Sequence, residues 1–216
     1  MREARARGQV VVIAKEPVPG RVKTRLTPPF TPQEAAGLAA AALADTLDAV
    51  ARVPAAGRVL ALEGNPGPWV PAGFAVVPQR GRGLDERLAA AFEDAHRRLP
   101  EPVVLIGMDT PQVTPETLST ALALLGSHDA VFGPAADGGF WLLGLRSPRA
   151  DLLLGVPMSQ SCTGAAQLAR LREAGLDVVL LPCLTDVDTA QDAAEVAAAA
   201  EGTRFAGALA RLGALR

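Results

Sequence analysis

The chain has 216 residues, about the length of one α/β domain, and 49% of them are hydrophobic, which is enough to build a large core. The formal net charge of −2 argues against a general nucleic-acid binder, which would carry a strong basic excess. The apolar run after the charged N-terminus is too short for a signal-peptide core or a bilayer span. We therefore expect a cytoplasmic protein without a membrane or nucleic-acid partner, with one domain over residues 1–216 and a loose tip at residues 1–8.

Strands and helices alternate along the chain, which is typical of an α/β fold with a mostly parallel sheet. Residues 10–14 are apolar and β-branched, and they are too few for a helix, so they predict a buried strand. Thr31 and Glu34 form a capping box with a proline at the first helical position, which predicts a helix to about Val50. Further elements are expected as strands at 58–62 and 74–77 and as a helix at 84–99.

The second half of the chain continues the alternation. Residues 103–106 are continuously apolar and predict a central strand. Asp137 and Gly138 are a strong tight-turn signal between strands expected at 129–132 and 140–145. The remaining elements are expected as a helix beginning at Thr114-Pro115-Glu116, a helix at 163–174, a strand at 178–181, and helices at 189–200 and 203–212.

The loop after the first strand is unusually basic. Such a loop lies at the carboxyl end of the sheet, where α/β proteins bind ligands, and clustered cations there favour a phosphate-rich ligand. The alternative is a solvated basic turn, but prolines and glycine fix a backbone that a mere linker would not need. The segment is not a P-loop, because it lacks the second glycine before its lysine. The candidate phosphate-binding residues are Lys15, Pro19, Gly20, Arg21, Lys23 and Arg25.

Three aspartates are candidate metal ligands. Asp109 directly follows the most apolar strand, where a charge is costly unless a partner such as a phosphate-bound Mg²⁺ pairs with it, although it also suits a cap of the next turn. Asp186 and Asp188 point to the same side of an extended segment and repel each other unless a cation lies between them. A helix cap at Thr189 explains that threonine but not both acids.

Two further patterns leave alternatives open. Asp137-Gly138-Gly139-Phe140 is explained either by a plain hairpin or by a substrate or acceptor site, in which Gly139 lets the ligand approach closely. Cys162 and Cys183 form neither a disulfide framework nor a zinc site, and we expect them to behave as small apolar residues.

Taken in order, these motifs resemble a bacterial family of GT-A-like transferases, the radical-SAM/selenodomain-associated transferases, which are often described as glycosyltransferases. The chain is also similar to 2-phospho-L-lactate guanylyltransferases and, more remotely, to molybdenum-cofactor nucleotidyltransferases, all in the nucleotide-diphospho-sugar transferase superfamily. The resemblance spans about residues 9–200. It implies a Rossmann-like three-layer α/β/α sandwich that binds a nucleotide at its first loop, with Mg²⁺ or Mn²⁺.

The resemblance also implies residue roles. Lys23 and Arg25 match the phosphate-contacting loop, Asp109 matches a metal-binding aspartate, and either Asp186 or Asp188 matches a second metal ligand. The chain departs from the family pattern at Met108, at Gln112 and over residues 158–163, where the family has a Trp-Ser-Thr-like segment. These departures concern the acceptor more than the nucleotide.

The leading hypothesis is a nucleotidyltransferase that moves a nucleoside monophosphate from a triphosphate to a small phosphorylated or hydroxyl acceptor and releases pyrophosphate. Lys23, Arg25 and Asp109 are then the expected catalytic residues. A glycosyltransferase that uses a nucleotide sugar is the alternative, and the lone Asp109 in place of an Asp-x-Asp pair argues against it. A non-catalytic nucleotide-binding protein is the third hypothesis. The base, the acceptor and the oligomeric state stay open.

Overall fold

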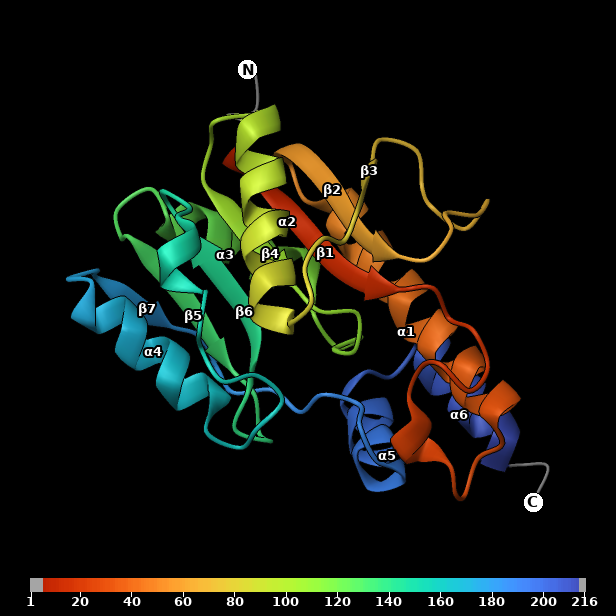
Figure 1. Cartoon of the computed structure of the whole chain (residues 1–216). Coiled ribbons are helices and arrows are strands. Elements are labelled where there is room, and N and C mark those ends of the chain that lie inside the picture. Colours follow the sequence, from red (N-terminus) through yellow and green to blue (C-terminus); the bar gives the residue numbers. More distant parts are fainter. Residues whose placement is uncertain (1–5, 214–216) are drawn as a thin grey trace.

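Seven strands form one sheet in the described part of the computed structural model, which covers residues 6–213 (Figure 1). Their order is β3-β2-β1-β4-β6-β5-β7, and all neighbours are parallel except that β6 runs antiparallel to β4 and β5. The mostly parallel sheet is therefore as predicted, and the short turn between β5 and β6 explains the one reversed strand. The strands are β1 (Ala6–Lys15), β2 (Ala55–Glu63), β3 (Ala75–Pro78), β4 (Val103–Ile106), β5 (Ala130–Pro134), β6 (Phe140–Leu145) and β7 (Val178–Leu180).

The helices begin where the sequence predicts them, within one or two residues. The capping box at Thr31 is present: its hydroxyl accepts a hydrogen bond from the Glu34 N–H, and the Glu34 carboxylate accepts one from the Thr31 N–H. A second box, between Thr189 and Asp192, starts α5. The helices are α1 (Pro32–Arg52), α2 (Leu84–Arg98), α3 (Pro115–Leu124), α4 (Thr163–Glu173), α5 (Ala190–Ala199) and α6 (Arg204–Gly213), with 3₁₀ turns η1 (Thr24–Leu26) and η2 (Ala150–Leu152).

The two longest strands begin earlier than expected. β1 starts at Ala6, which pairs with Ala55 of β2, so residues 6–8 belong to the sheet and not to a loose tip. Residues 1–5 of that predicted tip lie outside the described residues. The apolar pattern does not reveal this earlier start, because Gln9 is polar. In the structure the Gln9 side chain is nevertheless buried, and its amide donates to the carbonyls of Ala95 and Leu99.

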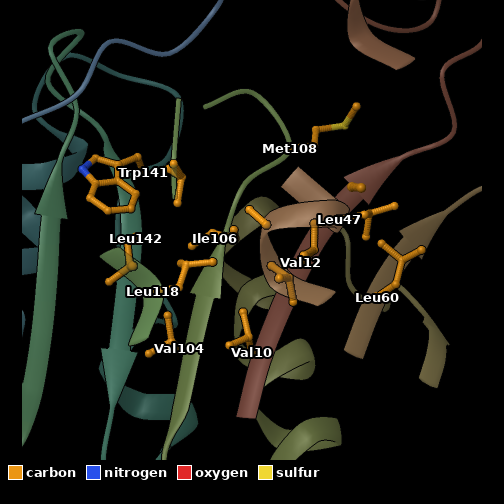
Figure 2. Packing of buried hydrophobic residues seen from close by; sticks show 14 of the residues in the cluster. Val10, Val12, Leu47, Leu60, Val104, Ile106, Met108, Leu118, Trp141 and Leu142 are labelled. Atoms are coloured by element: carbon orange, nitrogen blue, oxygen red, sulfur yellow. The ribbon is translucent and has the colours of Figure 1, made fainter. Parts of the chain in front are cut away.

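Two apolar clusters fill the two faces of the sheet and define the α/β/α layers. On one face, β1 and β4 side chains such as Val10, Val12 and Ile106 pack against Leu47 of α1 and Leu118 of α3 (Figure 2). On the other face, the alternate residues of β1 and β4 pack against α2, and α4 packs against β5. The three-layer expectation is confirmed.

A third cluster lies outside these layers, where α5 and α6 pack beside α1 (Figure 1). It joins Leu38 of α1 to Phe205 of α6, and both side chains are almost fully buried. It also takes in Leu26, from the loop after β1, and Val187, from the segment before α5. This cluster therefore reaches the two segments that carry the predicted phosphate and metal residues.

Two other expectations concern the surface. Among residues 6–213, the structure contains no helix with the length and apolar character that a bilayer crossing requires. Cys162 and Cys183 are free thiols, as expected, but both are exposed, so their predicted apolar role is wrong. Cys162 directly precedes α4, and Cys183 follows β7, where neither residue faces a core.

Candidate active site

Four segments meet at the edge of the sheet where the parallel strands end, here called the carboxyl edge. They are the loop after β1, the loop after β4, the β5–β6 turn and the segment after β7. The chain beyond β7 first continues beside β5, because the Leu184 N–H bonds to the Pro134 carbonyl at 3.1 Å. It then crosses to β4, where the Val187 N–H bonds to the Asp109 carbonyl at 3.0 Å. This path brings residues 186–188 beside Asp109.

An ion cluster forms where these segments meet. The Lys23 ammonium lies 2.5 Å from Asp109 Oδ2 and 3.0 Å from Asp188 Oδ1. Arg25 Nη1 lies 3.2 Å from the other oxygen, Asp188 Oδ2. The four groups carry two positive and two negative charges, so the cluster is neutral. The structure thus brings together four of the residues that the sequence singled out, with Asp109 86 residues and Asp188 165 residues from Lys23 along the chain.

Lys23 is the centre of this cluster. Its side chain is only 11% exposed. Burial alone would lower its pKa, but the charges of Asp109 and Asp188 outweigh burial and raise the pKa above the ordinary value, so the amine stays charged. Its backbone has a φ of 47°, in the left-handed region that non-glycine residues seldom adopt. Such a conformation costs about 1–3 kcal/mol. Residues with a strained backbone of this kind are found mainly at functional sites.

Asp186 differs from Asp188. Its Oδ1 is buried and has no hydrogen-bond partner among the described residues. Burial, followed by the nearby charges of Asp109 and Asp137, raises the pKa of Asp186 to about 8. At neutral pH it is therefore mostly protonated, whereas Asp188 is held in ion pairs. The expected repulsion between the two acids is relieved in this way, by neutralising one of them.

The other predicted phosphate residues lie beside β2. Lys15 Nζ is 3.5 Å from the carboxylate of Glu63, which also pairs with Arg87 of α2. Burial would raise the pKa of Glu63, but the Arg87 hydrogen bond and the Lys15 charge together lower it. Arg21 is exposed and lines a small pocket with Lys15 and Glu63, after the turn at Pro19-Gly20. The loop cations are thus divided between two places.

Glu63 and Arg87 are residues that the sequence reasoning missed. Glu63 is the last residue of β2, so its position at the carboxyl edge was a usable signal. Arg87 carried no such signal, because it lies within a helix whose charges suit a solvated face. Only the packing of α2 against the sheet brings it to Glu63.

The predicted acceptor turn has an internal structural role. Gly138 has a φ of 88°, and a side chain there would collide with the Ser161 carbonyl oxygen just before α4. The Gly138 carbonyl accepts the Gly164 N–H at 2.7 Å, and Phe140 packs against Phe132 with ring centroids 5.4 Å apart. The close approach that the glycines permit is therefore to the chain itself. The acceptor role of this turn stays a prediction.

The acidic residues suit a hard divalent cation. No group of three or more His, Cys, Asp or Glu side chains within residues 6–213 is arranged to hold a metal. Asp109 and Asp188 nevertheless direct carboxylate oxygens at one point, which the Lys23 ammonium occupies, and Asp186 Oδ1 is an orphaned oxygen nearby. Mg²⁺ commonly takes one or two protein carboxylates and completes its shell with water and phosphate oxygens. The donor chemistry therefore fits Mg²⁺ or Mn²⁺.

A mostly parallel sheet with cations and carboxylates at its carboxyl edge is the architecture of a Rossmann-like nucleotide-binding transferase. Comparison with known proteins places the chain more narrowly. It belongs to the family described as "Uncharacterized protein conserved in bacteria (DUF2064)", whose model matches residues 37–160.

Relatives of known name extend the match beyond that range. A 3-phospho-D-glycerate guanylyltransferase of Phenylobacterium zucineum (strain HLK1) is 34% identical, over 88% of this chain and 90% of that protein. A 2-phospho-L-lactate guanylyltransferase of Methanothermobacter thermautotrophicus (strain Delta H) is 30% identical, over 84% of this chain and 81% of that protein. Both cover well over two thirds of the chain, so the predicted similarity to guanylyltransferases is confirmed.

A solved structure agrees with the fold. The protein from Desulfovibrio desulfuricans G20 that is provisionally named a nucleotide-diphospho-sugar transferase superposes with a TM-score of 0.88 and 28% identity, over 96% of both chains. The predicted superfamily and fold are therefore confirmed, and the chain is an enzyme of the transferase class.

Proposed function

We propose that this protein transfers a nucleoside monophosphate from a nucleoside triphosphate to a small phosphorylated acceptor and releases pyrophosphate. The observation that carries the proposal is the cluster of Lys23, Arg25, Asp109 and Asp188 at the carboxyl edge. It combines cations for a polyphosphate with carboxylates for its metal. The names of the relatives, guanylyltransferases acting on phospho-acids, support both the reaction and the acceptor class.

The proposed chemistry needs positioning and charge neutralisation more than proton transfer. An ionised phosphate oxygen of the acceptor attacks the α-phosphorus, and the bond from that phosphorus to the α,β-bridging oxygen breaks. The bond electrons leave with the pyrophosphate, so no proton has to be removed first. Arg25, whose side chain is 71% exposed, and Lys23 neutralise the charge that builds up on the leaving group.

Asp109 and Asp188 would hold the divalent metal in this reaction. When bound, Mg²⁺ or Mn²⁺ supplies charge neutralisation across the α-phosphate and the leaving group. The protein's own part is to fix the two carboxylates, through the Val187 N–H bond to the Asp109 carbonyl and through the Thr189 cap that begins α5. We further propose a cytoplasmic location, with which the exposed free thiols of Cys162 and Cys183 are compatible.

A glycosyltransferase is the second candidate, favoured by the provisional name of the Desulfovibrio structure. The two functions differ in their products. Pyrophosphate from a triphosphate supports nucleotidyl transfer, whereas nucleoside diphosphate from a nucleotide sugar supports glycosyl transfer.

The test is an assay of pyrophosphate release with Mg²⁺, a panel of the four nucleoside triphosphates, and 3-phosphoglycerate or 2-phospholactate as acceptor. We expect one pyrophosphate for each nucleotide transferred, and a loss of kcat/KM of about 100-fold or more in Asp109→Asn, because electrostatic groups at a reacting phosphate carry losses of this order. Asp151→Asn is the control, since this exposed carboxylate lies on η2, outside the cluster. Activity that survives both chelation and Asp109→Asn would refute the proposal.

A further inference from the structure

The contacts of Lys23 indicate whether the site binds its metal alone or together with the nucleotide. We infer that Lys23 is an exchangeable cation: it neutralises Asp109 and Asp188 until a metal–triphosphate complex binds, and then moves to the phosphates. The substrate is accordingly the chelate of metal and nucleotide, and metal alone binds poorly. This inference rests on the proposed nucleotidyl transfer and names the substrate of that same site.

The carboxylate oxygens of the cluster are already occupied by cations. The Lys23 ammonium is in direct contact with one oxygen of Asp109 and one of Asp188. Arg25 holds the second oxygen of Asp188. Three of the four oxygens of these two carboxylates are therefore bonded to cationic nitrogens. A divalent metal held by both carboxylates would need the oxygens that the Lys23 ammonium contacts, so the two cations would compete for them.

The charges within the cluster balance. Two carboxylates and two cations sum to zero, so these four groups present no net negative charge to a free divalent cation. It also meets the positive charge of Lys23 at close range, which opposes its entry. A triphosphate changes this balance, because it offers Lys23 and Arg25 new anionic partners and leaves the carboxylates free for the metal that it carries. Metal and triphosphate must therefore each strengthen the binding of the other.

The Lys23 side chain is long enough to move from the carboxylates to a bound phosphate. Lysine carries its charge on a flexible four-carbon stem, so its ammonium can move by several ångströms without a change in the backbone. The backbone of the loop is anchored nearby by Leu26, which is fully buried in the third cluster. Lys15 is not placed for this exchange, because its ammonium contacts Glu63 beside β2 and not the carboxylates of the cluster. The exchange is thus assigned to Lys23, the lysine that contacts both Asp109 and Asp188.

The test measures the binding of Mn²⁺ alone, by the electron paramagnetic resonance signal of the free ion. We expect Lys23→Met to bind Mn²⁺ at least tenfold more tightly than the wild type. Lys15→Met is the matched control, because Lys15 and Lys23 are the two lysines of the chain and Lys15 does not touch the carboxylates. It should bind Mn²⁺ like the wild type. Equal or weaker binding by Lys23→Met would overturn the inference.

A second measurement uses the wild-type protein and so does not depend on how well the variant folds. Lysine labelled with ¹³C at Cε gives two side-chain signals, which Lys15→Met assigns. Inorganic tripolyphosphate with Mg²⁺ serves as a probe that carries no base. We expect the Lys23 signal to move with Mg²⁺ and tripolyphosphate together and to stay in place with Mg²⁺ alone. A Lys23 signal that stays in place in both samples contradicts the exchange.

The results separate this inference from the proposed function. Pyrophosphate release by the wild type with unchanged Mn²⁺ binding in Lys23→Met would leave the transferase standing and remove the exchange. Tighter Mn²⁺ binding in Lys23→Met without pyrophosphate release from any triphosphate would support the role of Lys23 and contradict the proposed nucleotidyl transfer.

Discussion

Asp186 and Asp188 are two residues apart but have different surroundings. Asp188 is ion-paired with Lys23 and Arg25. Asp186 Oδ1 is buried and has no hydrogen-bond partner among residues 6–213, and the pKa of this side chain is raised to about 8. Burial is the first cause of the raised pKa, and the nearby charges of Asp109 and Asp137 add to it. Asp188 is for this reason the better placed of the two as a metal ligand.

This raised pKa predicts how stability depends on pH in metal-free buffer. Between the ordinary aspartate pKa of 3.8, which holds in the unfolded chain, and the folded pKa of about 8, the folded state binds more protons at Asp186 than the unfolded state does. The contribution is fully present below pH 4 and is lost as the pH rises to 8. Asp186→Asn should remove this loss, which amounts to at most about 1.4 kcal/mol for each pH unit.

The measurement is the free energy of unfolding by urea at several pH values between 5 and 8, in the presence of a chelator. Asp151→Asn, an exposed acid on η2, serves as the control and should follow the wild type. If Asp186→Asn also follows the wild-type curve, Asp186 is ionised in the folded protein.

At the scale of elements, the β5–β6 turn is joined to the start of α4. The Gly138 carbonyl accepts the Gly164 N–H, and the turn is so close to Ser161 that no side chain fits at position 138. The conformation of the turn and the position of α4 are therefore coupled. The hairpin explanation of Asp137-Gly138 is sufficient for the backbone, while Asp137 stays near enough to influence the pKa of Asp186.

Gly138→Ala should accordingly destabilise the protein by more than a positive φ alone would. Gly155→Ala is the matched control, because Gly155 has a φ of 78° and open space where its side chain would lie. We expect about 1 kcal/mol for the control, from backbone strain alone, and a larger loss for Gly138→Ala, where the backbone must also shift. Urea unfolding of both variants measures the difference. Equal losses would mean that α4 adjusts freely.

At the scale of the whole molecule, the third cluster packs against two segments of the candidate active site. It buries Leu26, next to Arg25, and Val187, between the two acids, against α1, α5 and α6. The two halves of the ion cluster thus depend on helices that come from opposite ends of the chain. We therefore expect the C-terminal helices to support activity by holding these two segments together.

Phe205→Ala tests this support. Phe205 is fully buried in the third cluster, and its loss should cost about 3–5 kcal/mol of stability. Phe92→Ala is the matched control, since Phe92 is equally buried but lies in the cluster on the α2 face. At a temperature where both variants are folded, we expect pyrophosphate release to fall more in Phe205→Ala than in Phe92→Ala. A similar fall in both would mean that the third cluster supports stability alone.

The sequence by itself determined most of the elements. Short-range rules suffice for them: caps at Thr31 and Thr189, short apolar runs in the strands, and a turn signal at Asp137-Gly138. It also singled out the residues of the ion cluster, because polar side chains directly after buried strands gather at the carboxyl edge of a parallel sheet. The sequence did not predict the burial of Gln9 or the exposure of both cysteines, since neither follows from a local pattern.

Only the tertiary structure decided how those residues are paired. The four loop cations look alike in the sequence, yet Lys23 and Arg25 face the carboxylates while Lys15 faces Glu63. Asp186 and Asp188 look alike as well, and burial makes one neutral. The physical reason is that ion pairing and pKa depend on distances of a few ångströms between segments far apart in the chain. Such distances are fixed by the packing of the sheet and the third cluster, and no local pattern encodes them.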